Sequence, residues 1–221
     1  MVDNVNILLG VTGGIAAYKA VDLASKLTAA GASVNTVMTE SACRLIGPKS
    51  FEAVTQSAVF TSLWDLDARF NLRESSVEHR ESGIRNRAGN PQGGNLEHIA
   101  LVDWADVVVV APATANIVSK VANGICDDLL STILCACWPL IKSGATLLAP
   151  AMNNNMWANA AVQRNVKTVK EMGVELIGPV KGRLACGTEA IGRMAEPQDI
   201  LKAIEKIASK VKKHEARNPK S

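Results

Sequence analysis

The stretch VNILLGVTGGI, residues 5–15, decides the fold of this chain. Its first seven residues form a short, mostly apolar run that is rich in β-branched side chains, and Thr12-Gly13-Gly14 follows directly. This pattern is typical of a buried strand followed by a tight turn. Helical periodicity then runs from Ile15 to Ala30 and stops before Gly31, a residue at which helices commonly end. The chain therefore opens with a predicted strand–turn–helix unit.

The same alternation of strands and helices continues along the chain. The further predicted strands are Val34–Met38, Val59–Trp64 (a strand or an edge segment), Val107–Ala111, Thr146–Leu148 and Val174–Ile177. The further predicted helices are Thr39–Ile46, Ala115–Ala122, Asp127–Trp138, Ala158–Met172 and Pro197–Val211. Strands that alternate with helices predict a parallel sheet with right-handed crossovers. We therefore predict an α/β fold, a doubly wound parallel sheet in a Rossmann-like (flavodoxin-like) three-layer sandwich that forms a single domain.

Composition supports this fold and narrows the class of partner. Hydrophobic residues make up 48% of the 221 residues but aromatic residues only 4%, so the core is aliphatic, as in parallel strands buried on both faces. The net charge of +3 is too small to argue for nucleic acid, and no stretch has the roughly 18 apolar residues of a membrane span. We expect a small-molecule substrate, and neither nucleic acid nor a membrane as a partner.

The cysteines and the N-terminus indicate the cellular compartment. The five cysteines are odd in number, show no repeated paired spacing and have no histidine cluster beside them. This pattern predicts neither a disulfide framework nor a metal site. The N-terminus has no basic start followed by a cleavage site, as a signal peptide would have. We therefore predict a cytoplasmic protein.

Two segments depart from the strand–helix pattern. Residues 66–95 are polar, contain five arginines and end in a run of Gly, Asn and Pro, so we predict a long exposed insertion whose arginines are solvated rather than a binding patch. Residues 212–221 are basic, and we predict a disordered tail. The ordered domain is then predicted to span residues 1–211.

Functional residues are expected at the turns that follow the strands, because ligands of such folds bind at the carboxyl ends of the strands. The first turn is Thr12-Gly13-Gly14-Ile15, where glycine lets the backbone approach a ligand and helix N-terminal amides can hold a phosphate. The turn lacks the three-glycine dinucleotide motif and the Walker lysine, so a purely structural turn is equally compatible with it. Thr39, at the end of the second strand, offers a hydroxyl to the same crevice.

Two more turns carry small or amide side chains. In the segment 111–116, APATAN, the small residues can form the surface against which a flat ring packs, and Thr114 and Asn116 are candidate hydrogen-bond donors to that ring. A helix cap by Thr114 explains its hydroxyl at least as well. In the segment 150–157, PAMNNNMW, three asparagines stand beside Met156 and Trp157. An apolar wall with convergent amides suits an organic substrate that carries a carboxylate.

The last two candidates are a cysteine and a histidine. Residues 182–194, GRLACGTEAIGRM, contain three glycines, which predict a mobile flap that carries Cys186. A cysteine on such a loop is a better candidate for chemistry than one in an Ala/Leu helix, but it is more often incidental. His98 is the one histidine outside the insertion and the tail, and it is a candidate catalytic acid or base. The alternative is a capping or surface role without catalysis.

Taken together and in this order, the motifs resemble those of the flavin-containing cysteine decarboxylases, and within them the phosphopantothenoylcysteine decarboxylases. The resemblance runs from about Asn6 to Ala203 and is interrupted by the insertion. It is carried by residues 13–19 (GGIAAYK), His98-Ile99 with Trp104-Ala105-Asp106, residues 111–116, residues 150–157, and Ala185-Cys186-Gly187 with Gly192-Arg193-Met194. The asparagine motif and the cysteine flap are the specific signals.

The resemblance implies FMN as cofactor and assigns residues to roles. The implied FMN-binding residues are Gly13, Gly14, Ile15, Thr39, Ser41, Ala113, Thr114, Ala115, Asn116 and Ala151. The implied catalytic residues are His98, Cys186 and Asn153, and the implied substrate contacts are Asn153, Met156, Ala185 and Arg193. One departure stands in the flap, where Ala190 replaces the first glycine of the family's usual Gly-x-Gly, so the flap is expected to be stiffer.

The implied reaction is the decarboxylation of phosphopantothenoylcysteine to phosphopantetheine in coenzyme A biosynthesis. FMN takes a hydride from the thiol carbon and later returns it, so that the carboxylate leaves from a thioaldehyde, while Cys186 supplies a proton. The family implies a homotrimer, or a higher assembly of trimers, with the flavin at the subunit interface. Three alternatives remain: a decarboxylase of a peptide C-terminal cysteine, a flavin prenyltransferase, and a non-catalytic flavoprotein regulatory subunit.

Overall fold

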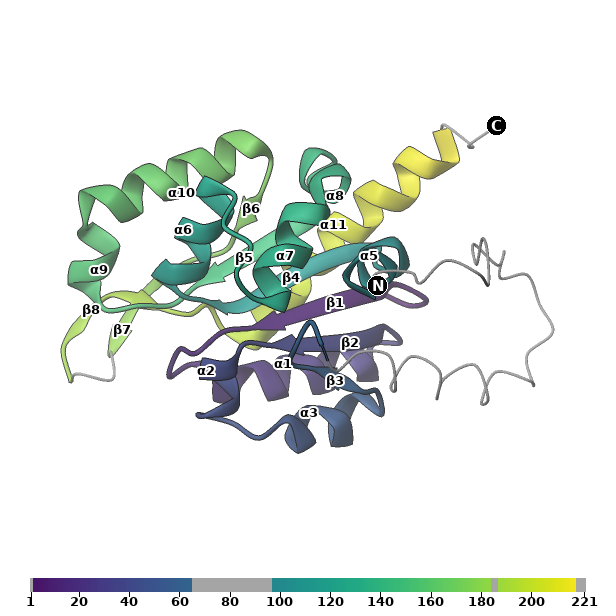
Figure 1. The fold of residues 1–221 in the computed structure, drawn as a ribbon, viewed down its shortest axis with the longest axis horizontal. Helices are drawn as coiled ribbons and strands as arrows, with labels where there is room; N and C mark the ends of the chain where they lie inside the picture. Colours follow the sequence, from purple (N-terminus) through teal and green to yellow (C-terminus); the bar gives the residue numbers. More distant parts are fainter. Residues whose placement is uncertain (1, 65–96, 184–186, 218–221) are drawn as a thin grey trace.

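The sheet of this protein consists of six parallel strands. The computed structural model describes residues 2–64, 97–183 and 187–217. The strands are β1 (Asn6–Val11), β2 (Ser33–Met38), β3 (Val59–Phe60), β4 (Val107–Ala113), β5 (Thr146–Pro150) and β6 (Glu175–Leu176). Their spatial order is β3-β2-β1-β4-β5-β6, and every neighbouring pair is parallel (Figure 1). The predicted doubly wound fold is confirmed, and the strand order is that of a Rossmann sheet.

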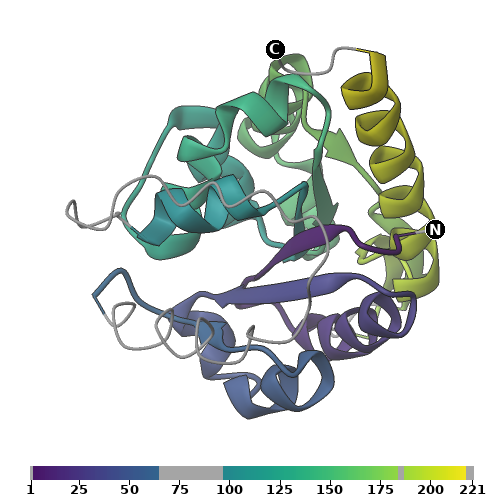
Figure 2. The same cartoon turned by 90° about the vertical axis from the view of Figure 1, so that its right-hand side faces the viewer.

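Helices cover both faces of this sheet (Figures 1 and 2). One face packs against α1 (Ala17–Ala29), α3 (Pro48–Thr55) and α11 (Pro197–Arg217). The other face packs against α5 (Glu97–Trp104), α6 (Ala115–Asn123), α7 (Leu129–Ala136), α8 (Trp138–Lys142) and α10 (Ala160–Met172). Short helices α2 (Glu40–Cys43) and α9 (Asn154–Ala158) and a separate antiparallel hairpin, β7 (Val180–Arg183) and β8 (Glu189–Arg193), complete the described chain.

The two faces follow from the alternation of side chains along each strand. In β1, Ile7 and Leu9 are buried in the core under α1 and α11, whereas Leu8 is buried in the opposite core. In β4, Val107 and Val109 join the first core, and Val108 and Val110 join the second. Because both faces are covered, these strands read as continuous apolar runs in the sequence.

Several boundaries differ from the predicted ones. The segment predicted as Val59–Trp64 is a strand only over Val59–Phe60. The helix predicted over Ala158–Met172 begins at Ala160, because Asn159 has an extended backbone and its side chain caps α10 by accepting from the amide of Ala161. The short helix α9 that precedes it was not predicted. The helix predicted to end at Trp138 stops at Ala136, and α8 begins anew with Pro139 in its first turn. Helices α3 and α5 and the hairpin were not predicted.

The last helix is longer than predicted. Helix α11 runs to Arg217, six residues past the predicted end at Val211, so the segment predicted to be a disordered tail is helical as far as Arg217. No glycine or proline interrupts the sequence between Pro197 and Pro219, and charged residues at the end of a helix are compatible with it. The predicted insertion at residues 66–95 lies outside the described residues.

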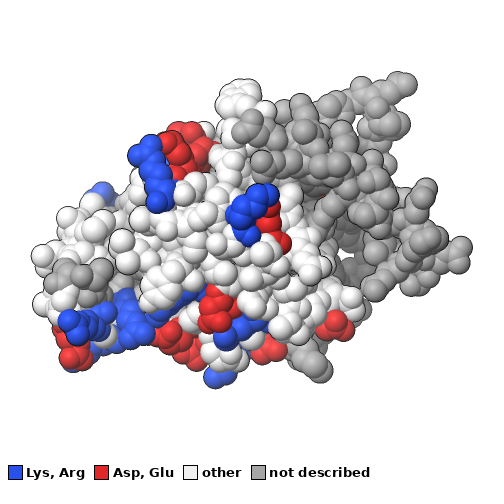
Figure 3. Space-filling view, turned by 90° about the horizontal axis from the view of Figure 1, so that it is seen from below, with Lys and Arg blue, Asp and Glu red and all other residues white. Residues whose placement is uncertain are grey.

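Charged side chains on the surface are largely arranged in local pairs. Figure 3 shows Lys and Arg groups beside Asp and Glu groups on the face seen from below. Examples are Lys26 with Asp22 on α1 and Arg44 with Glu40 on α2. In the described ranges, no helix has both the length and the apolar content needed to cross a membrane.

Candidate active site

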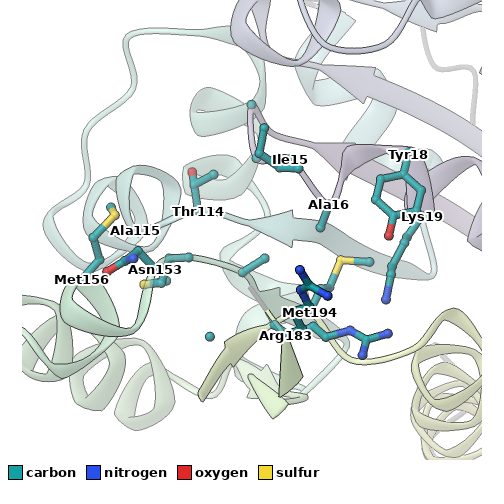
Figure 4. Close-up of a pocket in the computed structure, with 16 residues that line it drawn as sticks. Ile15, Ala16, Tyr18, Lys19, Thr114, Ala115, Asn153, Met156, Arg183 and Met194 are labelled. Atoms are coloured by element: carbon teal, nitrogen blue, oxygen red, sulfur yellow. The ribbon is translucent and has the colours of Figure 1, made fainter. Parts of the chain in front are cut away.

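A cavity of about 450 Å³ lies at the carboxyl ends of the central strands. Its lining comes from the turn after β1, the start of α6, the segment after β5 and the hairpin β7–β8 (Figure 4). The strand order reverses between β1 and β4, and such a reversal opens a crevice in which α/β proteins bind ligands. The volume falls within the roughly 300–1,000 Å³ that is usual for small-molecule and cofactor sites.

The glycine turn lies against helix α2. A β-carbon on Gly13 would lie 2.4 Å from the Cβ atom of Ser41, so only glycine fits the space that the turn leaves. The amide of Thr39 donates to the carbonyl oxygen of Val11 at 3.1 Å, which holds the ends of β1 and β2 together. Gly13, Gly14 and Ile15 line the cavity. Thr39 and Ser41 lie behind the turn, where the Thr39 hydroxyl caps α2 by accepting from the amide of Ala42.

A second wall comes from the end of β4. Thr114 and Ala115 line the cavity, whereas Ala113 is fully buried in the strand and Asn116 is exposed on α6 outside the cavity lining. The Thr114 hydroxyl accepts from the amide of Ile117 at 3.5 Å, so the capping role weighed from the sequence is present. The carbonyl oxygen of Ala113 accepts from the amide of Ala151 and joins this wall to the next one.

The asparagine segment forms the third wall. Ala151, Asn153 and Met156 all line the cavity, and Met156 is 48% exposed. The Asn153 side chain oxygen accepts from the amide of Asn155 at 2.8 Å, a bond that orients the side chain at the start of α9. Its amide nitrogen is the part of the side chain that can donate to a carboxylate.

The hairpin β7–β8 forms the fourth wall of the cavity. The amide of Met152 donates to the carbonyl oxygen of Gly192 at 2.9 Å, which attaches β8 to the asparagine segment. Arg193 and Met194 of the hairpin line the cavity, as predicted residues of the glycine-rich flap. Ala185 and Cys186 of the same flap lie outside the described residues.

The cationic end of this cavity was not predicted from the sequence. Lys19 and Arg183 line it on the side away from Asn153 and Met156 (Figure 4). The Lys19 ammonium donates to both carboxylate oxygens of Glu196 at 3.0 Å, and Arg193 donates to the same carboxylate. The spacing of Lys19 four residues after Ile15 was the available signal, because residues i and i+4 share one face of a helix.

His98 does not line this cavity. It is half-buried in the first turn of α5, and α5 packs on α7 and precedes β4. The end of α5 lies at the amino ends of the strands, because the amide of Asp106 donates to the carbonyl oxygen of Asn6. Within the described part of one chain, the cavity is thus lined by the asparagine segment but not by His98.

Comparison with known proteins gives the family. The family model described as Flavoprotein matches residues 1–209. The chain belongs to the flavoprotein family. The coenzyme A biosynthesis bifunctional protein CoaBC of Bacillus subtilis is 42% identical over 206 residues, which cover 93% of this chain and 44% of that protein. CoaBC of Escherichia coli is 37% identical over 88% of this chain and 41% of that protein. The chain thus spans less than half the length of these curated relatives.

Solved structures agree with this assignment. A PPC decarboxylase mutant complexed with pantothenoylaminoethenethiol has a TM-score of 0.72 and 31% identity, over 91% of this chain and 97% of that chain. The FMN-binding protein AtHal3 has a TM-score of 0.69 and 31% identity, over 91% of this chain and 95% of that chain. The resemblance to flavin-containing cysteine decarboxylases that the motifs indicated is confirmed.

Proposed function

We propose that this flavoprotein binds FMN and decarboxylates phosphopantothenoylcysteine to phosphopantetheine, a step of coenzyme A biosynthesis. One observation carries the proposal: a single cavity is lined by the glycine turn, by the asparagine segment and by the arginine-bearing hairpin. A turn alone would suit many phosphate ligands, but a decarboxylase also needs a group that holds the substrate carboxylate. The relatives named for coenzyme A biosynthesis and for PPC decarboxylase support the same substrate.

The residues at the turn fit a flavin nucleotide. Gly13 and Gly14 leave backbone exposed to the cavity, and the nearest atoms to a β-carbon on Gly14 would be those of Pro112 and Thr114 at 3.4 Å. The start of α1 follows directly, and helix N-terminal amides favour a phosphate. Ala115 and Ala151 are small and largely buried, which suits the wall beside a flat ring. When bound, FMN supplies a reversible hydride acceptor.

The chain's own side chains supply the rest of the chemistry. Asn153 donates through its amide to the substrate carboxylate, while Met156 and Met194 give the cavity apolar walls that exclude water. Cys186 delivers a proton to the decarboxylated substrate, and His98 acts as an acid or base. The FMN-binding domain spans residues 1–211 in this proposal. The protein is cytoplasmic in this proposal.

A second copy of the chain completes the site in this proposal. His98 is not among the residues that line the cavity, which supports a site whose catalytic histidine comes from a neighbouring subunit. A closed ring is the common solution for identical subunits that share such a site. We therefore propose a homotrimer, either alone or as part of a larger assembly of trimers.

The test begins with the purified protein and its absorption spectrum after reconstitution with FMN. We expect a flavin spectrum and the release of carbon dioxide from phosphopantothenoylcysteine but not from a peptide that ends in cysteine. His98→Asn should abolish release, and Cys186→Ser should still release carbon dioxide but accumulate the oxidised enethiol. A protein that binds no FMN would refute the cofactor. Turnover of the peptide but not of phosphopantothenoylcysteine would refute the proposed substrate and assign the protein to the peptide decarboxylases.

A further inference from the structure

Three basic side chains gather at one end of the active-site cavity. Lys19 comes from α1, Arg183 from β7 and Arg193 from β8, and all three line the cavity. The lining contains no aspartate or glutamate among the residues that the structure describes. Elsewhere on the surface, lysine and arginine commonly pair with a carboxylate one helical turn away. This end of the cavity therefore has an excess of positive charge.

One carboxylate holds two of these cations in place. The Lys19 side chain is only 10% exposed, and its ammonium lies 3.0 Å from both oxygens of Glu196. Arg193 donates through one guanidinium nitrogen to the same carboxylate. An arginine side chain has five N–H donors, so most donors of Arg193 remain available to a ligand. Two cations against one carboxylate leave a net charge of +1, and Arg183 adds one more.

The absence of a side chain at Gly182 leaves space in the hairpin for the side chain of Arg193. A β-carbon on Gly182 would lie 3.1 Å from Cδ and 3.2 Å from Nη1 of Arg193, so the side chain of Arg193 lies directly across the strand at Gly182. Val180, Lys181 and Gly182 pair with Arg193, Ile191 and Ala190 in the ladder. The strand β8 is in turn attached to the asparagine segment through Met152 and Gly192. The guanidinium is therefore held at a fixed place relative to Asn153.

We propose that Lys19 and Arg193, held by Glu196 and assisted by Arg183, bind the phosphate monoester at the far end of the substrate. The proposal rests on the proposed function and extends it. A phosphate monoester carries about −1.5 to −2 charges at pH 7, close to the excess charge of the cluster, and a guanidinium binds it through two parallel hydrogen bonds. Asn153 then takes the carboxylate at one end of the cavity, and the cationic cluster takes the phosphate at the other.

The phosphate of the substrate is favoured over that of FMN by the position of the cluster. In the proposed function the cofactor phosphate lies at the glycine turn, whose residues Gly13 and Gly14 line the cavity just before α1 begins. Lys19 lies in the first turn of α1, beyond the glycine turn, and its ammonium is paired with Glu196. The same ligand chemistry has two sources here, so the experiment has to separate them.

The experiment compares phosphopantothenoylcysteine with pantothenoylcysteine, which lacks the phosphate. The wild-type protein should prefer the phosphorylated substrate. In Lys19→Met and in Arg193→Gln, kcat/KM for the phosphorylated substrate should fall by about 10- to 100-fold, the equivalent of one charge-assisted hydrogen bond. For pantothenoylcysteine it should stay within about threefold of wild type. Lys19→Arg should retain most of the preference, because it keeps the charge.

Lys26→Met is the matched control on the same helix. Lys26 pairs with Asp22 and does not line the cavity, so its substitution removes the same charge without touching the cluster. Both kcat/KM values should remain at wild-type levels. A binding measurement runs beside the kinetics: calorimetry with phosphopantetheine and with pantetheine should show that Lys19→Met weakens only the former, while FMN titration gives the wild-type affinity.

The outcomes separate the two proposals. Equal losses of kcat/KM for both substrates in Lys19→Met would overturn the phosphate subsite while the proposed decarboxylase remains. Weaker FMN binding in Lys19→Met, with an unchanged preference between the substrates, would assign the cluster to the cofactor phosphate instead. A wild-type protein that binds FMN but turns over neither substrate would refute the proposed function, and the subsite with it.

Discussion

The hydroxyl of Thr12 donates a hydrogen bond of 2.7 Å to the carbonyl oxygen of Pro112, across 100 residues of sequence. The hydroxyl oxygen of Thr12 in turn accepts from the amide of Thr114 at 3.3 Å. Thr12 is only 3% exposed and follows β1, whereas Pro112 and Thr114 lie at the end of β4. One buried side chain thus fixes the glycine turn to the opposite wall of the cavity, at the point where the strand order reverses.

Replacement of this hydroxyl should weaken both the fold and the cofactor site. Thr12→Val keeps the size of the side chain but leaves the carbonyl of Pro112 and the amide of Thr114 without their partner. A buried polar group that loses its partner costs about 1–3 kcal/mol. We expect the free energy of unfolding in urea, measured at a fixed FMN concentration, to fall by that amount, and FMN to bind more weakly.

Thr28→Val is the control for this substitution. The Thr28 hydroxyl donates to the carbonyl oxygen of Ala24 within α1, so its loss removes one hydrogen bond far from the turn. Its FMN affinity should equal that of the wild type. If Thr12→Val also bound FMN like the wild type, the bridge between the two walls would have no role in holding the cofactor.

A methyl group at Gly13 should disrupt the contact with α2. The β-carbon of Gly13→Ala would lie 2.4 Å from Cβ and 3.0 Å from the backbone carbon of Ser41, so the turn or α2 has to move. Overpacking of this kind typically costs about 1–3 kcal/mol. We expect a corresponding loss of unfolding free energy and a loss of FMN affinity, measured by fluorescence quenching of the flavin.

Gly47→Ala gives the opposite expectation in the same region. Gly47 precedes α3 with φ of −69° and ψ of 138°, and nothing lies within 4 Å of the position of its β-carbon. Substitution there should leave FMN binding unchanged and change the unfolding free energy by less than about 1 kcal/mol, because the gain from restricting the unfolded chain is opposed by the preference for glycine over alanine at the N-cap of α3. Equal FMN affinities in the two alanine variants would show that the fit of Gly13 against Ser41 is irrelevant to the cofactor.

The fold was predictable because its signals are local. The apolar runs of β1 and β4 and the glycines at positions 13, 14, 31 and 173 mark strands, turns and helix ends within a few residues of sequence. The start of α10 was predicted two residues early, because Asn159 caps the helix in a segment whose periodicity continues through it. The hairpin was not predicted because glycines in both of its strands are typical of a mobile flap.

The site was predictable only where a motif lies on one turn. Gly13, Thr114 and Asn153 could each be picked from their positions after a strand, and the structure brings them to one cavity. Lys19 and Glu196 are 177 residues apart, and neither belongs to a pattern that marks an ion pair. Such a pair depends on how α1 packs beside the end of the hairpin, which is a tertiary contact without a local signal.

The buried thiol of Cys137 should make stability depend on alkaline pH. Burial raises the pKa of this thiol from 9.0 to about 11. The unfolded chain therefore releases its proton above pH 9, whereas the folded protein holds it until about pH 11. The unfolding free energy should fall over this window, by about 3 kcal/mol at most, since one pKa unit corresponds to about 1.4 kcal/mol.

Urea denaturation at pH 8, 9, 10 and 11 measures this contribution. Cys137→Ala should show a shallower loss of stability with pH than the wild type, even though it starts from a lower value. Ile141→Val, which removes a buried methylene group from the same hydrophobic core without removing a thiol, should lower the stability but retain the wild-type slope. Parallel slopes for all three proteins would mean that Cys137 is not protected from ionisation by the fold.

The separation of His98 from the cavity predicts complementation between two inactive variants. His98→Asn retains an intact cavity, and Asn153→Ala retains an intact histidine. If each active site takes its cavity from one subunit and its histidine from a neighbour, a mixed oligomer contains sites with both intact groups. Co-expression of the two variants with different affinity tags, followed by purification through both tags, isolates such oligomers. The readout is carbon dioxide released from phosphopantothenoylcysteine.

Random assembly of equal amounts gives a quantitative expectation. Purification through both tags removes trimers of a single variant, and every mixed trimer contains one site out of three in which the cavity and the neighbouring histidine are both intact. About a third of the sites in the purified mixed trimers should therefore regain wild-type activity. Oligomers that carry two tags on the same variant are the control and should stay inactive. A mixed oligomer that binds FMN and remains as inactive as its parents would place His98 in the cavity of its own chain, which would require α5 to rearrange from its packing against α7.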